Sequence, residues 1–167
     1  GHEGCCFLLG EPDTSWLFLV IWSCSLVLKR ICVIDGQGGG IGATLIKYLK
    51  QAYGESVELI GLGTNAIATA QMLKAGANRG ASGENAIVHT VGTADLIVGP
   101  ISITWANAML GEVTPKMAEA VMSGPAKKIL LPLTQEPVIL VGMVNAPLPH
   151  MVQCVVNEKI KEVFADV

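Results

Sequence analysis

The chain has 167 residues, of which 51% are hydrophobic and 15% are charged, and its formal net charge at pH 7 is −3. It is too apolar to be a disordered protein, and it is long enough for one globular domain with a substantial core. Because no basic stripe interleaved with aromatic residues occurs, we expect no nucleic-acid partner.

The first 28 residues differ in composition from the rest of the chain. They hold three of the five cysteines, two of the three tryptophans and two of the three phenylalanines. Their apolar run, residues 15–28, would rise only about 21 Å as a helix, against about 30 Å for the hydrocarbon core of a bilayer, so we expect no stable membrane insertion. We interpret residues 1–28 as a non-native or disordered apolar extension, and residues 29–167 as a single domain. A membrane-surface anchor and an arm that packs on a partner are the alternatives for the extension.

From residue 29 onward, apolar runs alternate with helical spacings. The β-branched run "RICVID" predicts a buried parallel strand, and "IGATLIKYLKQAY" predicts a helix because its apolar residues fall on one face. A second strand and a second helix follow, and the helix is capped by Thr64 or Asn65 and ends at Gly76. The expected strands lie at 30–35 and 56–62, and the expected helices at 41–53 and 64–77.

The second half of the domain continues the alternation. A third helix begins with Ser82 as its cap, and a later helix has Thr114 as N-cap with Pro115 in the first helical position. The apolar runs "AKKILLPL" and "PVILVGM", separated by "TQE", predict a hairpin. The expected helices lie at 82–94, 114–124 and about 149–164, and the expected strands at 95–103, 126–133 and 137–143.

Strands that alternate with helices predict a three-layer, Rossmann-like α/β domain. We expect a mostly parallel sheet of about five strands, because buried parallel strands read as continuous apolar runs. The hairpin adds one antiparallel edge strand to this sheet.

Cysteine usage indicates a reducing compartment, so we expect a cytoplasmic location. The chain has no C-x-x-C pair and no Cys and His residues at zinc-ligand spacing, which leaves no predicted metal site. Cys32 and Cys154 lie in apolar surroundings that are typical of a core.

Five glycines fall between residues 36 and 42, directly after the first strand and at the start of the first helix. A turn of this kind presents backbone N–H groups at the positive end of the helix dipole, which favours an anion. The turns at 61–65, 77–85 and 99–104 share the same sheet edge and are rich in small polar residues. The candidate cofactor-binding residues are Asp35, Gly36, Gln37, Gly38, Gly39, Gly40, Ile41, Gly42, Gly63, Thr64, Asn65, Arg79, Ser82, Gly99 and Pro100.

The spacing from Gly36 to Gly42 resembles the G-x-x-x-G-I-G fingerprint of short-chain dehydrogenases, and this resemblance implies NAD or NADP as cofactor. The Y-x-x-x-K pair of that family is absent, and the second strand ends in Gly61-Leu62-Gly63 without an acidic residue for a ribose hydroxyl. The same stretch also resembles the deviant P-loop of partition-type ATPases. Ala43 stands where that loop has its phosphate-binding lysine, so we do not expect ATP hydrolysis.

A wider resemblance runs from residue 29 to the C-terminus. The segments "ICVIDGQGGGIG", "GTNAIATAQMLKAGA" and "GENAIVHTVGTADLIVGPI", with the pair "ILLPL" and "ILVGM", resemble a small bacterial family classed only as domain of unknown function 3842. The resemblance implies a compact Rossmann-like domain and implies no activity.

Several polar residues have both a functional and a structural interpretation. Arg79 either clamps a phosphate or carboxylate or is a solvated loop residue. Asp35 either binds a ribose or a metal or caps the turn through a neighbouring N–H. Glu84 and Asn85 either stabilise a helix start or contact a ligand, and His89 is either a general base or a half-buried histidine.

These observations predict a protein that binds the phosphate of a nucleotide or dinucleotide, with no assigned activity. The expected partners are a phosphorylated small molecule or nucleotide and a second copy of the chain in a homodimer. One alternative is a small NAD(P)-dependent oxidoreductase that completes its site across the dimer, with substrate positioned by Ser102, Thr104 or Asn107. The other is a structural or regulatory domain without a nucleotide. No acid/base pair stands out, so the catalytic residues are unknown.

Overall fold

The structure is a computed structural model that describes residues 28–165. The predicted extension, residues 1–28, therefore lies outside the described residues except for Leu28. Within the described part of the chain, no helix is both long enough and apolar enough to cross a membrane.

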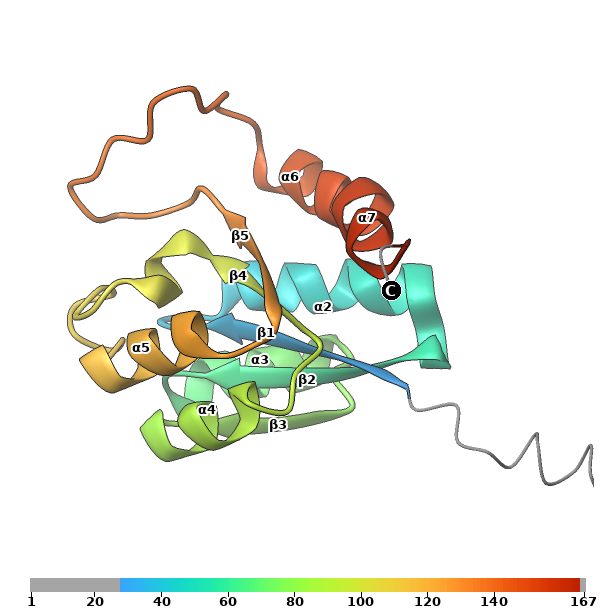
Figure 1. The fold of residues 1–167 in the computed structure, drawn as a ribbon, viewed down its shortest axis with the longest axis horizontal. Helices are drawn as coiled ribbons and strands as arrows, with labels where there is room; N and C mark the ends of the chain where they lie inside the picture. Colours follow the sequence, from blue (N-terminus) through green and yellow to red (C-terminus); the bar gives the residue numbers. More distant parts are fainter. Residues whose placement is uncertain (1–27, 166–167) are drawn as a thin grey trace, which may run out of the picture.

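Five parallel strands form the central sheet (Figure 1). The strands stand in the order β3-β2-β1-β4-β5, and every neighbouring pair is parallel. This arrangement confirms the α/β class and the parallel sheet of five strands. The bounds are β1 Lys29–Asp35, β2 Val57–Gly63, β3 Arg79–Ser82, β4 Leu96–Pro100 and β5 Lys127–Leu131.

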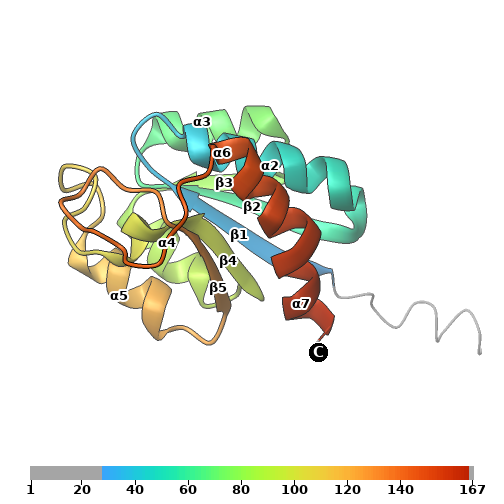
Figure 2. The same cartoon turned by 90° about the horizontal axis from the view of Figure 1, so that it is seen from above.

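Helices cover both faces of the sheet, as the two views in Figures 1 and 2 show. One apolar core joins the sheet to α2, α3 and the C-terminal helices, and a second core joins the opposite face to α4 and α5. The bounds are α2 Gly40–Tyr53, α3 Ala66–Ala75, α4 Glu84–Val91, α5 Pro115–Ser123, α6 Leu148–Cys154 and α7 Ile160–Ala165. Short helical turns lie at η1 Gly54–Ser56, η2 Ile101–Thr104 and η3 Val155–Lys159, and η3 is a π-helical turn that joins α6 to α7.

The central strand β1 shows why the sheet is buried on both sides. Ile31 and Val33 belong to the core under α2, whereas Cys32 and Ile34 belong to the core under α4 and α5. All four are at most 1% exposed, and the alternation follows from the two-residue period of a strand. Cys32 is therefore a core residue, and its burial raises the pKa of its thiol to about 12.

The helix ends follow the predicted signals at three positions. The side chain of Asn65 caps α3 by accepting a hydrogen bond from the backbone N–H of Ala68 at 2.8 Å. The Thr114 hydroxyl caps α5 by accepting a hydrogen bond from the N–H of Met117 at 3.2 Å, and Pro115 is its first residue. Gly76 ends α3 with φ +119°, in the left-handed region that favours glycine.

The predicted antiparallel edge strand is wrong. Among the described residues, β5 pairs only with β4, and residues 132–147 form a loop. An apolar run can form a strand only where its backbone groups find partners, and here Pro137 lacks an N–H while Gly142 has φ +83°. The side chains of Ile139 and Val141 are consequently more than 90% exposed.

Two further predictions need correction in the segment 77–85. Residues 79–82 form the edge strand β3, where a loop was predicted, because small polar residues leave no apolar signal. The predicted cap Ser82 is instead the last residue of β3, and α4 begins at Glu84 with Gly83 as its N-cap.

A third correction concerns the end of β4. Residues 101–103, predicted to extend this strand, belong to η2.

Candidate functional site

The glycine turn, residues 36–39, connects the end of β1 to the start of α2. Gly39 has φ +73°, and a Cβ there would lie 2.7 Å from the Cα of Ala68 in α3. The backbone N–H of Gly39 donates to the carbonyl of Gly36 at 2.9 Å, which closes the turn. Glycine is therefore required at residue 39 both by the backbone conformation and by the close approach of α3.

Asp35 holds the turn from inside. Its side chain is 3% exposed, and its two oxygens accept the N–H groups of Gly36 at 2.8 Å and Gly42 at 2.7 Å. Burial raises the pKa of Asp35 above its ordinary value despite these hydrogen bonds. Among the interpretations of Asp35, the structure agrees with the one in which its carboxylate caps the turn by accepting neighbouring N–H groups.

Two backbone donors, one in the glycine turn and one at the first residue of α2, remain open to solvent. Among the described residues, nothing accepts a hydrogen bond from the backbone N–H of Gly38 or of Gly40. Both glycines are exposed, and both line the same cavity. The positive end of the α2 dipole therefore meets solvent through these two groups.

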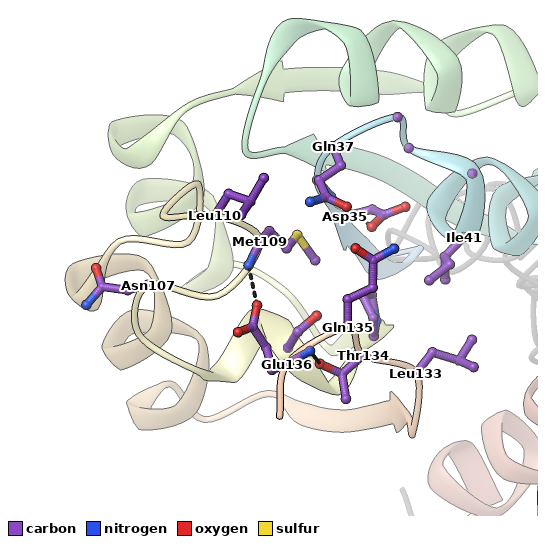
Figure 3. A pocket seen from close by; sticks show the side chains of 16 residues that line it. Asp35, Gln37, Ile41, Asn107, Met109, Leu110, Leu133, Thr134, Gln135 and Glu136 are labelled. Atoms are coloured by element: carbon purple, nitrogen blue, oxygen red, sulfur yellow. Dashed lines mark hydrogen bonds between the residues drawn. The ribbon is translucent and has the colours of Figure 1, made fainter. Parts of the chain in front are cut away.

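The cavity has a volume of about 680 Å³, which is within the usual range for small-molecule sites. Figure 3 shows it between the glycine turn, the residues after β4, and two loops. Its charged lining residues are Asp35 and Glu136, and no Lys, Arg or His of the described residues lines it. The remaining lining residues are Gly36, Gln37, Gly38, Gly39, Gly40, Ile41, Pro100, Ser102, Asn107, Met109, Leu110, Leu133, Thr134 and Gln135.

The cavity lies at the carboxyl ends of β1 and β4. In the order β3-β2-β1-β4-β5, the chain moves outward on one side of β1 and then crosses to the other side at β4. Loops that follow β1 and β4 therefore separate in opposite directions and leave a crevice between them. Open α/β sheets bind their ligands in such crevices.

A carboxylate that no sequence motif indicated lies beside the cavity. Oε2 of Glu112 accepts hydrogen bonds from the backbone N–H of Gln37 at 2.8 Å, the hydroxyl of Thr64 at 2.6 Å and the side-chain amide of Asn65 at 2.9 Å. Burial acts to raise the pKa of Glu112, but these hydrogen bonds outweigh it and hold the pKa below its ordinary value.

Residues 105–113, here called the Glu112 segment, have an unusual backbone. Asn107, Met109 and Leu110 have φ between +56° and +65°, a region that side-chain-bearing residues adopt at a cost. The N–H of Met109 donates to Oε1 of Glu136 at 2.8 Å, which ties the segment to the loop after β5 (Figure 3). The side chain of Leu110 is 97% exposed.

The structure brings most of the predicted site residues to one place. Asp35 to Ile41 and Pro100 line the cavity, as do Ser102 and Asn107 of the enzyme alternative. Thr64 and Asn65 lie in the next turn, and Asn65 also donates to the carbonyl of Gln37 at 2.9 Å.

Other predicted residues serve packing or lie elsewhere. A Cβ on Gly99 would lie 2.4 Å from the carbonyl oxygen of Ile34, and Gly42 and Gly63 are similarly closed in. Arg79 is the first residue of β3 and therefore lies at the amino end of this strand, whereas Ser82 lies at its carboxyl end. Arg79 forms an ion pair with Glu58. It lines a separate cavity of about 280 Å³ together with His89, and it does not line the larger cavity.

Sequence reasoning missed Glu112 and the cavity-lining residues Met109, Leu110 and 133–136. These residues belong to loops, and no periodicity or spacing marks them. Gly111, shortly before the N-cap Thr114, is a local sign of a turn, but it does not mark Glu112 as a site residue. Of the acidic and polar pair at 84–85, the carboxylate of Glu84 accepts a hydrogen bond from the Thr114 hydroxyl at 2.6 Å, which links the start of α4 to the start of α5.

The fold and the cavity define an α/β protein with an open crevice at the point where the strand order reverses. The chain belongs to the family described as "Domain of unknown function (DUF3842)", which matches residues 30–164. No curated protein matches the sequence. A solved structure titled "Crystal structure of universal stress protein in complex with cAMP" is 20% identical, with a TM-score of 0.35, over 60% of this chain and 94% of that chain. This similarity is too low to assign the ligand of that protein to this chain.

Proposed function

We propose that this domain binds a nucleotide or dinucleotide in the cavity, with a phosphate at the exposed N–H groups of Gly38 and Gly40. The observation that carries the proposal is that the two residues with open donors, at the start of α2, line a cavity of about 680 Å³. Backbone N–H groups at a helix N-terminus bind phosphate without a basic side chain. The strand order supports the proposal, because dinucleotide-binding domains place the pyrophosphate at the same point.

The charge of the residues that line the cavity limits which nucleotides it can bind. Asp35 and Glu136 are acidic, and no basic side chain of the described residues faces the cavity to neutralise a polyanion. A triphosphate would therefore be repelled more strongly than the pyrophosphate diester of a dinucleotide. Within the expected cofactors this favours NAD over NADP, which carries an additional phosphate, and both over ATP.

The proposal is for binding. Among the lining residues, Asp35 and Glu136 carry the carboxyl groups, and Asp35 already accepts two backbone N–H groups. The N–H of Met109 occupies one oxygen of Glu136. A proton-transfer residue for an oxidoreductase would have to come from elsewhere, such as a second copy of the chain. The homodimer expected from the sequence stays a prediction, which sedimentation equilibrium of the full chain would test.

The first test is a thermal-shift titration of the full chain with NAD, NADH, NADP, NADPH, ATP, AMP and FMN. A ligand at about 100 times its Kd stabilises the folded state by about 2.7 kcal/mol, which raises Tm by several degrees. We expect the dinucleotides to give the largest shifts. The absence of a shift with every ligand would overturn the proposal in favour of a structural or regulatory domain.

A matched pair of variants localises the binding. A Cβ on Gly40 would meet nothing within 4 Å, so Gly40→Val should fold while its side chain blocks the phosphate position. Gly92, at the end of α4, is equally open and lies away from the cavity, so Gly92→Val is the control. We expect loss of ligand binding in Gly40→Val alone. Binding by Gly40→Val as tight as that of the parent would contradict the proposed site.

A further inference from the structure

The Glu112 carboxylate occupies a point at which donors from two turns converge. The backbone N–H of Gln37 comes from the turn after β1, and the Thr64 hydroxyl and Asn65 amide come from the turn after β2. All three donate to Oε2 of Glu112, which enters from the distant segment between η2 and α5. A backbone N–H, a hydroxyl and an amide aimed at one point are also the donors that a phosphate oxygen needs.

The Glu112 segment also covers the wall of the cavity at Gly36. A Cβ on Gly36 would lie 2.5 Å from Sδ of Met109 and 2.9 Å from Oε2 of Glu112. Gly36 lines the cavity next to the open donors of Gly38 and Gly40. A phosphate at those donors would therefore lie close to the carboxylate. Gln37, which donates to Glu112, precedes Gly38 directly, so the second phosphate of a pyrophosphate bound at Gly38 and Gly40 would reach the donors of Glu112. Two anions cannot share these donors, so the second phosphate and the Glu112 carboxylate compete.

The backbone of the Glu112 segment indicates that its position is maintained by these contacts. Asn107, Met109 and Leu110 have positive φ values, which L-residues adopt only where surrounding contacts impose them. Leu110, at 97% exposure, contributes almost no packing. The segment is anchored in the core by the buried residues Ala108 and Val113, and by polar contacts at Glu112 and, through the N–H of Met109, at Glu136. Loss of the Glu112 contact would free the exposed part of the segment around Leu110 from the glycine turn.

We infer that Glu112 is a built-in competitor of the ligand: a ligand phosphate displaces its carboxylate from Gln37, Thr64 and Asn65, and the Glu112 segment moves away from the glycine turn. This inference rests on the proposed function, because it concerns the phosphate site of the same cavity. It makes the arrangement in which Glu112 occupies the three donors an autoinhibited state. The apparent affinity of the site then equals its intrinsic affinity reduced by the fraction of molecules in which Glu112 is displaced.

The test is isothermal titration of the full chain with inorganic pyrophosphate and with NAD. We expect Glu112→Ala to bind pyrophosphate about tenfold more tightly than the parent, or more, because a site that is open in a tenth of the molecules loses about that factor. Glu112→Gln keeps an acceptor oxygen without the charge, so it should gain less. This variant also keeps the test valid if Glu112→Ala fails to fold.

Glu136→Ala is the matched control for charge. It removes another carboxylate at the cavity that accepts an N–H from the same segment, but that carboxylate does not lie on the three converging donors. General relief of repulsion would raise the affinity of both alanine variants alike, whereas displacement predicts a clearly larger gain for Glu112→Ala. Equal gains would overturn the inference.

A second substitution shows where the phosphate goes. Thr64→Val removes the hydroxyl that donates to Glu112, and in the Glu112→Ala background it should weaken pyrophosphate binding severalfold. Weaker binding by Glu112→Ala than by the parent would overturn the inference and make Glu112 a ligand-binding or turn-supporting residue, while NAD binding that is lost in Gly40→Val would keep the proposed function. If neither ligand binds the parent or Glu112→Ala, both the proposed function and the inference fail.

Discussion

The glycine turn and the Glu112 segment face each other across the edge of the cavity, and they are built in different ways. The turn places Gln37 and Gly39 at positive φ, and the buried carboxylate of Asp35 holds it from inside. The Glu112 segment places three side-chain-bearing residues at positive φ. Its buried residues Ala108 and Val113 seat it in the core, and polar contacts join it to the turn and to Glu136. The turn is therefore built mainly from consecutive residues of the chain, whereas the segment meets it from a distant part of the sequence.

The largest expected effect is a loss of stability in the turn. Gly39→Ala places a Cβ at φ +73° and 2.7 Å from the Cα of Ala68. The left-handed conformation and the overlap together should lower the free energy of unfolding by about 2–5 kcal/mol. Urea unfolding measures this, and Gly40→Ala is the control, since a Cβ there meets nothing within 4 Å. A Gly39→Ala variant as stable as Gly40→Ala would show that the turn is not held as described.

The next effect concerns the inner carboxylate. Asp35→Ala leaves the buried N–H groups of Gly36 and Gly42 without their acceptor, which should lower the free energy of unfolding by about 1–3 kcal/mol. Asp95 is an exposed carboxylate that accepts the N–H of Arg30 at 2.7 Å, so Asp95→Ala is the matched control with a smaller loss. Equal losses in the two variants, measured by urea unfolding, would mean that burial of Asp35 adds nothing to its role.

The same contrast explains what the sequence could predict. Elements marked by apolar periodicity and local caps, such as α3 with Asn65 and α5 with Thr114, were confirmed. The edge strand β3 was not predicted, because its residues carry no apolar pattern and it is stabilised by parallel pairing with β2. The run at 137–143 has the apolar pattern without a pairing partner, and it forms a loop. Periodicity reports which side chains are suited to burial, but pairing depends on the rest of the fold.

The candidate site divides in the same way. The glycine turn is local, so its residues could be found from a few consecutive letters of sequence. The acceptor that completes it, Glu112, lies 75 residues beyond Gln37 in the chain. Only the tertiary fold brings the two together, and a single acidic residue in a loop has no spacing that would reveal its partner.

Acid should weaken the contact between the two regions. The pKa of Glu112 in the folded protein is below its ordinary value, so its contribution to stability is present above the ordinary pKa and is lost as pH falls through the folded pKa. We expect the stability difference between the parent and Glu112→Ala, measured by urea unfolding at a series of pH values, to shrink below about pH 4.5, the ordinary pKa of glutamate.

Asp35 should respond to pH with the opposite sign. Its folded pKa is raised by burial, so ionisation of Asp35 costs stability. The pH-dependent part of its contribution is present below its ordinary pKa and is lost as pH rises through the folded value. The comparison of Asp35→Asn with the parent over the same pH series should therefore change in the direction opposite to that of Glu112→Ala. Parallel changes in the two variants would contradict the assignment of one carboxylate to the buried turn and the other to the hydrogen-bonded contact.

The smallest expected effect lies in the Glu112 segment, where one substitution should maintain or raise stability and weaken pyrophosphate binding. Leu110 has φ +57° and is 97% exposed, so Leu110→Gly removes backbone strain and loses little packing. Relief of about 1–2 kcal/mol of strain, set against about 0.5–1 kcal/mol for the flexibility of glycine in the unfolded chain, should leave stability unchanged or raise it by up to about 1.5 kcal/mol. If the strain favours displacement of Glu112, the same variant should bind pyrophosphate less tightly, because its closed state is relaxed. Leu110→Ala shortens the side chain but keeps the strained conformation, so it should change neither quantity. A Leu110→Gly variant that is less stable than Leu110→Ala would remove strain from the account of the segment.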